Sequence, residues 1–352
     1  MTNIVPPISV LKAYDLHDPS IEVSTISNGL INHTWKLNQG NHAWILQKIN
    51  TSVFQQPEWI QENIEQLGRY IQSINPQYQF VMPLSASDGT TLVEQDGNFY
   101  RLFTYIPNSQ TITVVENTQQ AKEAAFQFGN FTRQFANFDC SQLHTTIKSF
   151  HDLSFRYEQF QQSLRHGVQE RVIQAEKWIA LLASFSFIEQ TYRSILTDPE
   201  FKVRVMHHDT KISNILFDQN HHGLCVIDLD TVMPGYFFSD LGDMFRTYLS
   251  PVNEEEKDLS LIQVRIDMYK AIVEGYAQGM GDVLTEKERQ SFFDAGAIMI
   301  YMQALRFMTD FLNGDQYYQI QYPTHNFERA KNQITLLQQY LSKKNEFQQL
   351  LK

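Results

Sequence analysis

The sequence predicts an α+β fold of two lobes, a small N-terminal lobe built on an antiparallel sheet and a larger, mainly helical C-terminal lobe. Three observations support this prediction. Residues 21–106 carry the pattern of short strands and hairpins around a single helix, whereas residues 107–352 carry mostly helical periodicity. A polar loop of fixed spacing, at residues 207–214, marks a candidate site in the second region. We therefore expect an N-terminal lobe of residues 1–106 and a C-terminal lobe of residues 107–352.

The first strands are indicated by alternation and by turn residues. Apolar or β-branched side chains alternate with polar ones over residues 21–25. The stretches 34–37 and 43–49 flank a turn of Asn, Gln and Gly at residues 38–41. These patterns predict antiparallel strands joined by short turns.

A helix and two more hairpins complete the predicted N-terminal lobe. Residues 57–72 are expected to be helical, because Pro57 suits a first helical turn. One apolar stripe follows the helical period, formed by Ile60, Ile64, Leu67 and Ile71. The pairs Asp88-Gly89 and Asp96-Gly97 indicate hairpin turns, the second of which leads into a strand at residues 99–106. The order of strands, one helix and further strands predicts a small sheet that carries one helix.

The chain is expected to cross between the lobes at residues 107–109, and helices dominate beyond them. Segments 259–277 and 285–312 have helical periodicity. The second is bounded by a predicted capping box, Thr285 with Glu288, and by the stop signal Asn313-Gly314.

Composition limits the classes of function. The 352 residues are 42% hydrophobic, enough for a folded core, and their net charge of −11 argues against nucleic acid as the main partner. Cys140 and Cys225 are the only cysteines and lack metal-type spacing. The N-terminus shows no apolar signal region, and the apolar stretches are too short to span a membrane. We expect a cytoplasmic protein, a monomer or a weak dimer, with small-molecule partners.

The loop at residues 207–214 is the most informative feature of the sequence. It reads H-x-D-x-K-x-x-N, and an apolar hairpin at residues 215–227 then leads to Asp228. This spacing is typical of ATP-dependent phosphoryl transfer, in which an Asp orients the acceptor hydroxyl while an Asn and a second Asp hold Mg²⁺. Asp209 is the predicted base, with Asn214 and Asp228 as the metal ligands. Lys211 either reaches a phosphate oxygen or is a solvated surface residue.

His207 and Asp230 are two further notable positions of this region. His207 is predicted to be structural, bridging the loop to the Asp228 segment. For Asp230, assistance to the metal and simple termination of the strand remain open. A zinc site formed by the nearby histidines is disfavoured, because their spacing matches no familiar ligand pattern.

The N-terminal lobe offers candidates for holding the nucleotide. Residues 27–32, which include Gly29 and Asn32, lie between two predicted strands where a phosphate-covering loop belongs, although one glycine is a weak motif. Lys48 lies in the third predicted strand, where a kinase lysine pairs with the α- and β-phosphates. Its usual partner is a helix glutamate. The three candidates all lie opposite the apolar stripe, so periodicity does not choose among Glu58, Glu62 and Glu65.

Candidates for the acceptor pocket lie downstream. Asp243 and Arg246 are one helical turn apart, and Arg306 and Asp310 share a polar face with Gln303 on an otherwise apolar helix. Buried charges need partners. These residues therefore form either a structural ion network or the fixed donors and acceptors that a polar substrate requires.

Taken together, these stretches resemble the aminoglycoside phosphotransferase and choline kinase superfamily, which has a protein-kinase-like fold, and within it the N-acetylhexosamine 1-kinase family. The similar segments, in chain order, are Gly29–Asn32, Trp44–Asn50, Phe150–Asp152, Asp209–Lys211, Asp228–Gly235, Gly242-Asp243 with Arg246, and Arg306–Asp310 with Gly314-Asp315. The family pattern usually has Asn at the position of His208 and often Arg at that of Lys48.

The resemblance implies ATP- and Mg²⁺-dependent phosphorylation of the anomeric hydroxyl of GlcNAc or GalNAc. By position it places the base at Asp209, the metal ligands at Asn214 and Asp228, and the phosphate lysine at Lys48. It favours Glu62 as the helix partner. Relatives with similar loops phosphorylate homoserine, choline or aminoglycosides, which remain alternatives. A non-catalytic nucleotide-binding protein is a further alternative.

Overall fold

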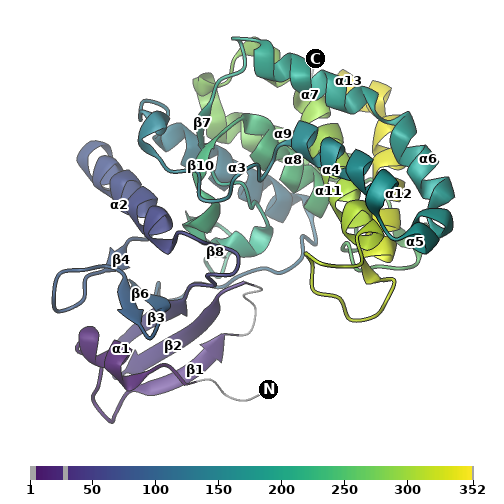
Figure 1. Cartoon of the computed structure of the whole chain (residues 1–352). Helices are drawn as coiled ribbons and strands as arrows, with labels where there is room; N and C mark the ends of the chain where they lie inside the picture. The colour runs from purple at the N-terminus through teal and green to yellow at the C-terminus, as the bar shows by residue number, and fades with distance from the viewer. Residues whose placement is uncertain (1–4, 27–30, 351–352) are drawn as a thin grey trace.

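The structure, a computed structural model, describes residues 5–26 and 31–350. Its smaller lobe is a six-stranded antiparallel sheet (Figure 1). Five strands follow in the order β1 (Glu22–Ile26), β2 (His33–Gln39), β3 (His42–Lys48), β6 (Asn98–Thr104) and β4 (Pro83–Leu84), and β5 (Val93–Gln95) pairs with β6. The predicted turn residues Asp96 and Gly97 both have positive φ, 51° and 70°, as the β5–β6 hairpin requires.

The two faces of this sheet have different environments. One face packs on the short helix α1 (Ile8–Ala13) around a separate small core, formed by Val10, Leu11, Tyr14, Leu16, Trp35, Leu37, Leu46, Ala86, Tyr100 and Leu102. Because side chains alternate along a strand, the intervening residues of β2, β3 and β6 face the other lobe. This second face is the one that can meet a ligand between the lobes.

Helix α2 (Pro57–Ile74) lies between the sheet and the larger lobe (Figure 1). Pro57 stands in its first turn, and all four residues of the predicted stripe are buried in the main core. The helix was therefore predicted correctly from residue 57, and it runs two residues further than expected.

The larger lobe is mainly helical. Its long helices are α3 (Thr118–Gln134), α4 (Leu153–His166), α7 (Phe187–Thr197), α8 (Phe237–Tyr248), α9 (Ile266–Met280), α11 (Phe292–Leu312) and α12 (His325–Ser342). Shorter ones are α5 (Gln169–Gln174), α6 (Glu176–Ser184), α10 (Glu286–Gln290) and α13 (Lys344–Leu350). Helix α11 is buried over most of its length and packs on α4, α8 and α12. Helices α3 and α9 approach closely at Gly129, where an added Cβ would lie 2.8 Å from the carbonyl oxygen of Tyr276.

Two of the predicted helical segments differ in detail. The segment 285–312 is two helices, α10 and α11, because the chain turns at Ser291. The capping box of Thr285 and Glu288 is confirmed at the start of α10, and Glu288 also forms a buried ion pair with Arg204. In the segment 259–277, residues 259–261 form a single 3₁₀ turn and α9 begins only at Ile266.

Short strands frame the polar loop. Strands β7 (Arg204–Met206) and β10 (Met233–Gly235) pair with each other, as do β8 (Ile215–Phe217) and β9 (Gly223–Val226). The second pair is the predicted hairpin, which is confirmed. The fold class, an antiparallel N-terminal sheet followed by a helical region, is confirmed as well.

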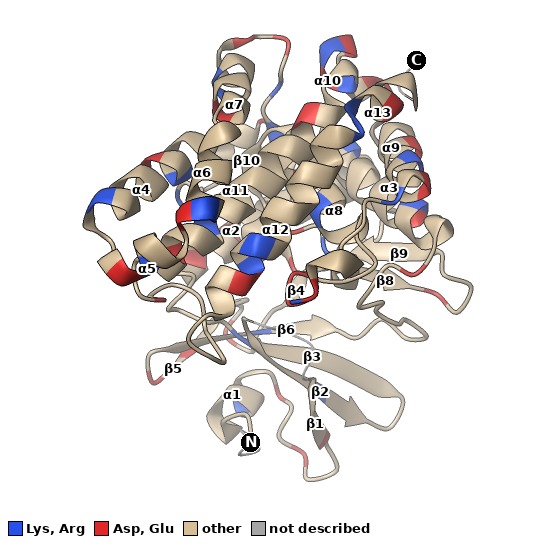
Figure 2. Ribbon diagram, turned by 90° about the vertical axis from the view of Figure 1, so that its right-hand side faces the viewer, with Lys and Arg blue, Asp and Glu red and all other residues tan. Residues whose placement is uncertain are grey.

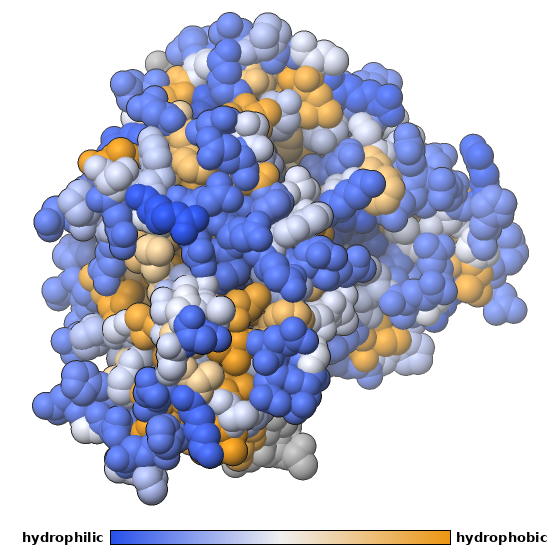
Figure 3. Space-filling model, turned by 60° about the vertical axis from the view of Figure 1, so that its left-hand side comes forward, coloured by the Kyte–Doolittle hydropathy of each residue, from blue (hydrophilic) through white to orange (hydrophobic). Residues whose placement is uncertain are grey.

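None of the helices in the described part of the chain is long and apolar enough to cross a membrane. Basic and acidic residues are interspersed on the outer helices in Figure 2. Hydrophilic residues cover most of the face seen in Figure 3, where hydrophobic residues form separate small patches.

Candidate active site

A cleft of about 460 Å³ lies between the open face of the sheet and the polar loop. Strands β2, β3 and β6 supply the wall on the side of the smaller lobe, with Thr34, Lys36, Ile45, Gln47, Arg101 and Phe103. Its floor includes Asp209, Lys211, Asn214 and Asp228. The three residues that the loop spacing predicts to act together therefore line one cleft.

Hydrogen bonds explain why these residues converge. The ring of His207 is fully buried, and its Nε2 lies 2.9 Å from the carbonyl oxygen of Ile227, directly before Asp228. The backbone N–H of Ile227 donates in turn to the carbonyl of Asn214 at 2.9 Å. These contacts join the loop to the strand that delivers Asp228. The predicted structural role of His207 is confirmed.

Asp240, in the first turn of α8, binds the loop from the side of the larger lobe, and no local sequence pattern singles it out. It is completely buried, and its carboxylate accepts the backbone N–H of His207 at 3.0 Å and of His208 at 2.7 Å. Burial raises the pKa of Asp240 to about 7, although these two hydrogen bonds oppose the rise. Because it grips the residues just before Asp209, Asp240 fixes where the loop places its carboxylate.

Asp243 and Arg246, predicted as substrate ligands, face inward in this structure. Asp243 accepts the backbone N–H of Thr210 at 3.0 Å and Nε of Arg246 at 2.9 Å. The hydroxyl of Tyr248 donates to the carbonyl of Thr210. Helix α8 thus clamps both sides of the loop, and Asp243 is a structural partner of the loop because its oxygens are already occupied.

Asp209 and Lys211 form an ion pair at the mouth of the loop. Nζ of Lys211 lies 3.1 Å from Oδ1 of Asp209. Burial raises the pKa of the Asp209 carboxyl, but Lys211 and His207 outweigh it, so the pKa lies below its ordinary value. The same pair, led by the charge of Asp209, raises the pKa of Lys211 to about 12. Asp209 is therefore ionised and Lys211 charged at neutral pH. Lys211 is 41% exposed, so solvent partly screens the pair.

Asn214 and Asp228 offer oxygen ligands to the same part of the cleft. The Nδ2 of Asn214 donates to the backbone carbonyl of Asp209 at 2.9 Å, and this bond fixes the amide so that its oxygen is the free end. Asp228 adopts a left-handed backbone conformation, with φ 60°. Its carboxylate is exposed in the cleft and accepts no hydrogen bond within the described ranges. The walls of the cleft, and then the charges of Asp230 and Asp209, raise its pKa to about 7.

These two residues fit Mg²⁺ better than a metal that needs a full protein cage. In residues 5–26 and 31–350, no group of three or more His, Cys, Asp or Glu side chains could hold a metal ion. Mg²⁺ is usually held by one or two hard oxygen ligands together with substrate phosphates and water. The donor set of Asn214 and Asp228 matches that pattern.

Asp230 connects the two lobes. It is 1% exposed, and its Oδ2 accepts Nδ2 of Asn32 at 2.7 Å, while its Oδ1 forms an ion pair with Arg101 of β6. With both oxygens occupied by donors of the small lobe, Asp230 is an interlobe contact and not a metal ligand in this structure. Asn32, predicted as a nucleotide residue, lines the cleft.

The remaining nucleotide candidates fall elsewhere. Lys48 follows Leu46 on the α1 face of β3, so it does not join Gln47 in lining the cleft. Glu62 is 56% exposed and pairs with His144 at 2.6 Å. The structure therefore does not bring Lys48 and Glu62 together at the cleft, because the strand register turns the lysine to the opposite face. Gly29 lies outside the described residues.

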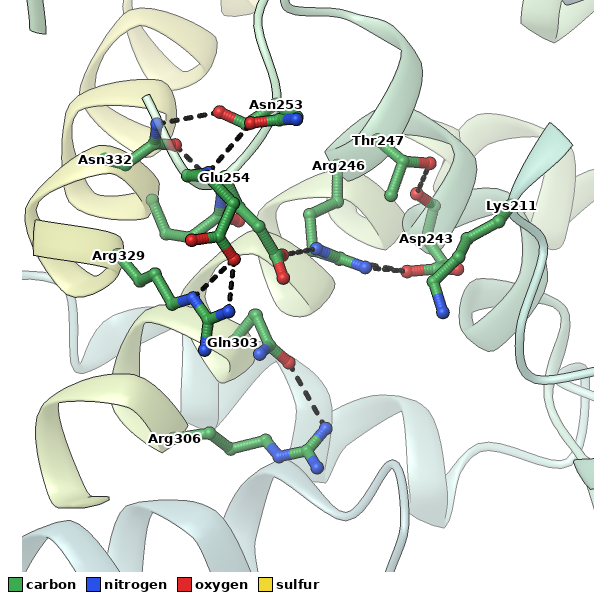
Figure 4. A network of polar contacts seen from close by, with 12 residues as sticks. Lys211, Asp243, Arg246, Thr247, Asn253, Glu254, Gln303, Arg306, Arg329 and Asn332 are labelled. Carbon is green, nitrogen blue, oxygen red and sulfur yellow. Dashed lines mark hydrogen bonds and ion pairs between the residues drawn. The ribbon is translucent and has the colours of Figure 1, made fainter. Parts of the chain in front are cut away.

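Arg306 of α11, predicted to line an acceptor pocket, lies among three aromatic rings. Its guanidinium lies 5.5–5.8 Å from the ring centres of Phe150, Tyr317 and Tyr318 and donates to Oε1 of Gln303 at 3.2 Å. It has no carboxylate partner in the described part of the chain. Figure 4 shows Arg306 and Gln303 in the lower part of the network, below the ion pair of Arg246 and Glu254, with Lys211 at its right. The ring of Phe150 stacks on His151, whose Nδ1 lies 3.5 Å from Nδ1 of His208, so Arg306 lies near the start of the loop. Burial, His208 and Arg306 hold the pKa of His151 well below its ordinary value.

Asp310, predicted as a substrate ligand, orders residues 316–318 next to Arg306. Its Oδ1 accepts the backbone N–H of Gln316 and of Tyr317, both at 2.8 Å. Its Oδ2 accepts the N–H of Tyr318 and Nδ2 of Asn326, both at 2.9 Å. Asp310 thus orders the segment that presents two tyrosines to Arg306, and it has no oxygen left for a substrate. No ion pair joins it to Arg306 among the described residues.

Comparison with known proteins identifies the family. The model described as APH, phosphotransferase enzyme family, matches residues 22–278. This chain belongs to that family. The match covers the sheet, the cleft and the loop, and it identifies the protein as a member of a phosphotransferase enzyme family.

Solved structures of similar fold cover nearly the whole chain. One is a microcompartment-associated aminopropanol kinase, with a TM-score of 0.67, 15% identity, and 95% of this chain and 96% of that chain covered. Another is a spectinomycin phosphotransferase in complex with ADP and spectinomycin (TM-score 0.62, 11% identity, 96% and 97% covered). A third is a choline kinase from Cryptosporidium parvum Iowa II (TM-score 0.56, 16% identity, 96% and 94% covered). At these identities the likeness concerns the fold alone.

Proposed function

We propose that this protein transfers the terminal phosphate of ATP to a sugar hydroxyl, and that its acceptor is the anomeric hydroxyl of an N-acetylhexosamine, GlcNAc or GalNAc. The observation that carries the kinase chemistry is the convergence of Asp209, Asn214 and Asp228 in one cleft. The acceptor assignment rests on the resemblance of the sequence and on the charge of the acceptor side.

The chain's own residues have distinct parts in this reaction. The acceptor hydroxyl binds beside Asp209, whose ionised carboxylate orients it and takes its proton as the new O–P bond forms and the bond to the ADP oxygen breaks. Lys211 lies next to that carboxylate and offers a positive charge to the phosphate in transfer. Mg²⁺, when bound by Asn214 and Asp228, would offset phosphate charge. Asp240 and Asp243 keep the loop in place.

The acceptor side favours a neutral sugar over a cationic acceptor. Arg306 has no carboxylate partner among the described residues, and the nearby Arg156 donates only to Gln159 and to two backbone carbonyls. Arg156 and Arg306 both contact Phe150, Arg156 at its backbone carbonyl and Arg306 over its ring. Burial and then Arg306 lower the pKa of Arg156 to about 10, while Asp152 opposes the fall. Choline, ethanolamine and aminoglycosides carry positive charge, so two arginines that form no ion pair within the described residues would repel them. Sugar hydroxyls accept hydrogen bonds from a guanidinium, and tyrosine rings suit sugar faces.

An acceptor panel tests this function. ADP release is measured with GlcNAc, GalNAc, homoserine, choline and an aminoglycoside at equal concentration, and NMR locates the phosphate on the product. We expect turnover with an N-acetylhexosamine and phosphate at its anomeric carbon. A preference for choline or the aminoglycoside contradicts the acceptor assignment. Absence of ADP release with every acceptor, together with no stabilisation by Mg-ATP, indicates a non-catalytic protein.

Arg306→Gln separates the acceptor from the nucleotide in the same assay. The variant loses one cation that faces the acceptor, so KM for the sugar is expected to rise about tenfold or more while KM for ATP stays the same. Arg265→Gln is a matched control, because Arg265 donates to the backbone carbonyls of Leu249, Tyr248 and Ser250. An equal rise of both KM values in Arg306→Gln contradicts the placement of Arg306 in the acceptor pocket.

A further inference from the structure

We infer that Arg101 of β6, held in place by Asp230 and Gln47, is the cation that binds the phosphates of ATP, in place of the third-strand residue Lys48. This inference rests on the proposed function, since it assigns a nucleotide-binding residue to the same cleft. It replaces the assignment that position along the sequence favours.

The register of the sheet places Arg101, and not Lys48, on the cleft face. Gln47 of β3 lies directly opposite Arg101 of β6, and Lys48 lies opposite Tyr100. Tyr100 belongs to the small core beneath α1, whereas Gln47 and Arg101 both line the cleft. Opposite residues on adjacent strands project from the same face of a sheet. On the cleft face, β3 thus presents the amide of Gln47 where phosphate binding requires a cation. The neighbouring strand β6 supplies that cation, Arg101.

The contacts of Arg101 leave one of its nitrogens without a hydrogen-bond partner in the described part of the chain. Its Nε and Nη2 donate to Oε1 of Gln47 at 3.1 and 2.8 Å, and Nη2 also pairs with Asp230. Its Nη1 is buried and has no hydrogen-bond partner in the described part of the chain. A buried donor without a partner is costly, and such atoms are uncommon. A guanidinium suits phosphate because its donors form a rigid fork. Two of its three nitrogens are fixed here, and one remains for a ligand.

The partner of this cation is also replaced. In the usual arrangement a helix glutamate fixes the phosphate lysine. The α2 glutamates have other contacts, Glu62 with His144 and Glu65 with Arg69 and Thr91. Asp230 takes that part from the other lobe, two residues after the candidate metal ligand Asp228. Arg101 and Asp228 therefore belong to one connected assembly around the phosphates.

Binding measurements without acceptor test this inference directly. The dissociation constants of Mg-ATP and of adenosine are measured by calorimetry for the wild type, Arg101→Gln and Lys48→Gln. We expect Arg101→Gln to weaken Mg-ATP at least tenfold and to leave adenosine within about threefold, because adenosine has no phosphates. Lys48→Gln should change neither constant. A tenfold loss of Mg-ATP affinity in Lys48→Gln, with Arg101→Gln unchanged, overturns the inference.

A charge exchange guards against a purely structural effect. Removing Arg101 leaves Asp230 buried without its counter-ion, so Arg101→Gln can lower stability. The double variant Gln47→Arg/Arg101→Gln returns the cation to the same face of the sheet, one strand away, and is expected to recover Mg-ATP affinity to within threefold of the wild type. If Arg101→Gln weakens adenosine and Mg-ATP equally, or the exchange restores folding without Mg-ATP affinity, Arg101 is an interlobe contact only. These outcomes do not depend on the acceptor, so they are distinct from failure of the acceptor panel.

Discussion

Replacing Asp310 by asparagine tests whether Asp310 orders residues 316–318, which present two tyrosines to Arg306. The four hydrogen bonds that Asp310 accepts are divided equally between its two oxygens. Asparagine keeps one oxygen and puts an NH₂ group in place of the other, so two N–H donors, for example those of Tyr318 and Asn326, then face a donor.

The expected magnitude follows from those two bonds. Hydrogen bonds to charged groups contribute about 1.5–3 kcal/mol each, so the ordered segment loses about 3–6 kcal/mol if it stays in place. The segment can release part of this strain by moving away from Arg306. If only about 1.4 kcal/mol of the loss appears in acceptor binding, KM for the acceptor rises about tenfold.

Steady-state ADP release gives both KM values for the Asp310→Asn variant. We expect KM for the sugar to rise about tenfold or more and KM for ATP to stay within twofold, because the cleft residues are not touched. Asp139→Asn is the control, since Asp139 also accepts backbone and side-chain donors of its own turn but is exposed at the start of a short 3₁₀ helix. An unchanged KM for the sugar refutes the account of this wall, and so does an equal rise in KM for ATP.

Two further predictions concern the loop and the metal. Asp240→Asn presents an NH₂ group to one of the two backbone N–H donors that precede Asp209. Steady-state kinetics should show kcat lowered about 100-fold with KM for ATP nearly unchanged, because the loop no longer holds Asp209 in place. A kcat within threefold of the wild type contradicts the positioning role of Asp240. The raised pKa of Asp228, about 7, means that its carboxyl is protonated and neutral below that pH. The affinity for Mg²⁺ in the presence of ATP should therefore fall as pH drops from 8 to 6, and by more than in Asp228→Asn, which retains only the titration of the nucleotide. Equal pH dependence in the two proteins, measured by Mg²⁺ titration, rules this out.

Much of the fold was accessible from local sequence, because its signals are local. The stripe of α2, the Asp-Gly turns and the capping box of α10 each depend on residues within a few positions of one another. The break at Ser291 was missed because α10 and α11 share a continuous helical pattern. A single turn there is decided by packing and not by periodicity.

The site could be predicted only in part, because some of its contacts join residues that are far apart in the sequence. That Asp209, Asn214 and Asp228 line one cleft could be predicted because one loop and one hairpin carry them. Lys48 was placed by its strand and not by its side of the strand, and an error of one residue reverses the face. Arg101 and Asp230 are 129 residues apart. No local pattern connects them.

Asp243, Arg246 and Asp310 show a second limit. Their spacing on helices was read correctly as a sign of paired polar groups, but spacing does not say whether the partner is a substrate or the protein's own backbone. In the structure Asp243 and Asp310 both accept backbone N–H groups of neighbouring loops. Such contacts depend on which loop lies against the helix, and this is a property of the tertiary fold.

Single-turnover kinetics of Asp209→Asn show whether Asp209 is the base of phosphoryl transfer. The variant keeps the size of the side chain but cannot take the acceptor proton, so phosphoryl transfer from pre-bound Mg-ATP should slow by about 100-fold or more while Mg-ATP affinity and melting temperature stay close to those of the wild type. Phosphoryl transfer at the wild-type rate in this variant would exclude Asp209 as the base.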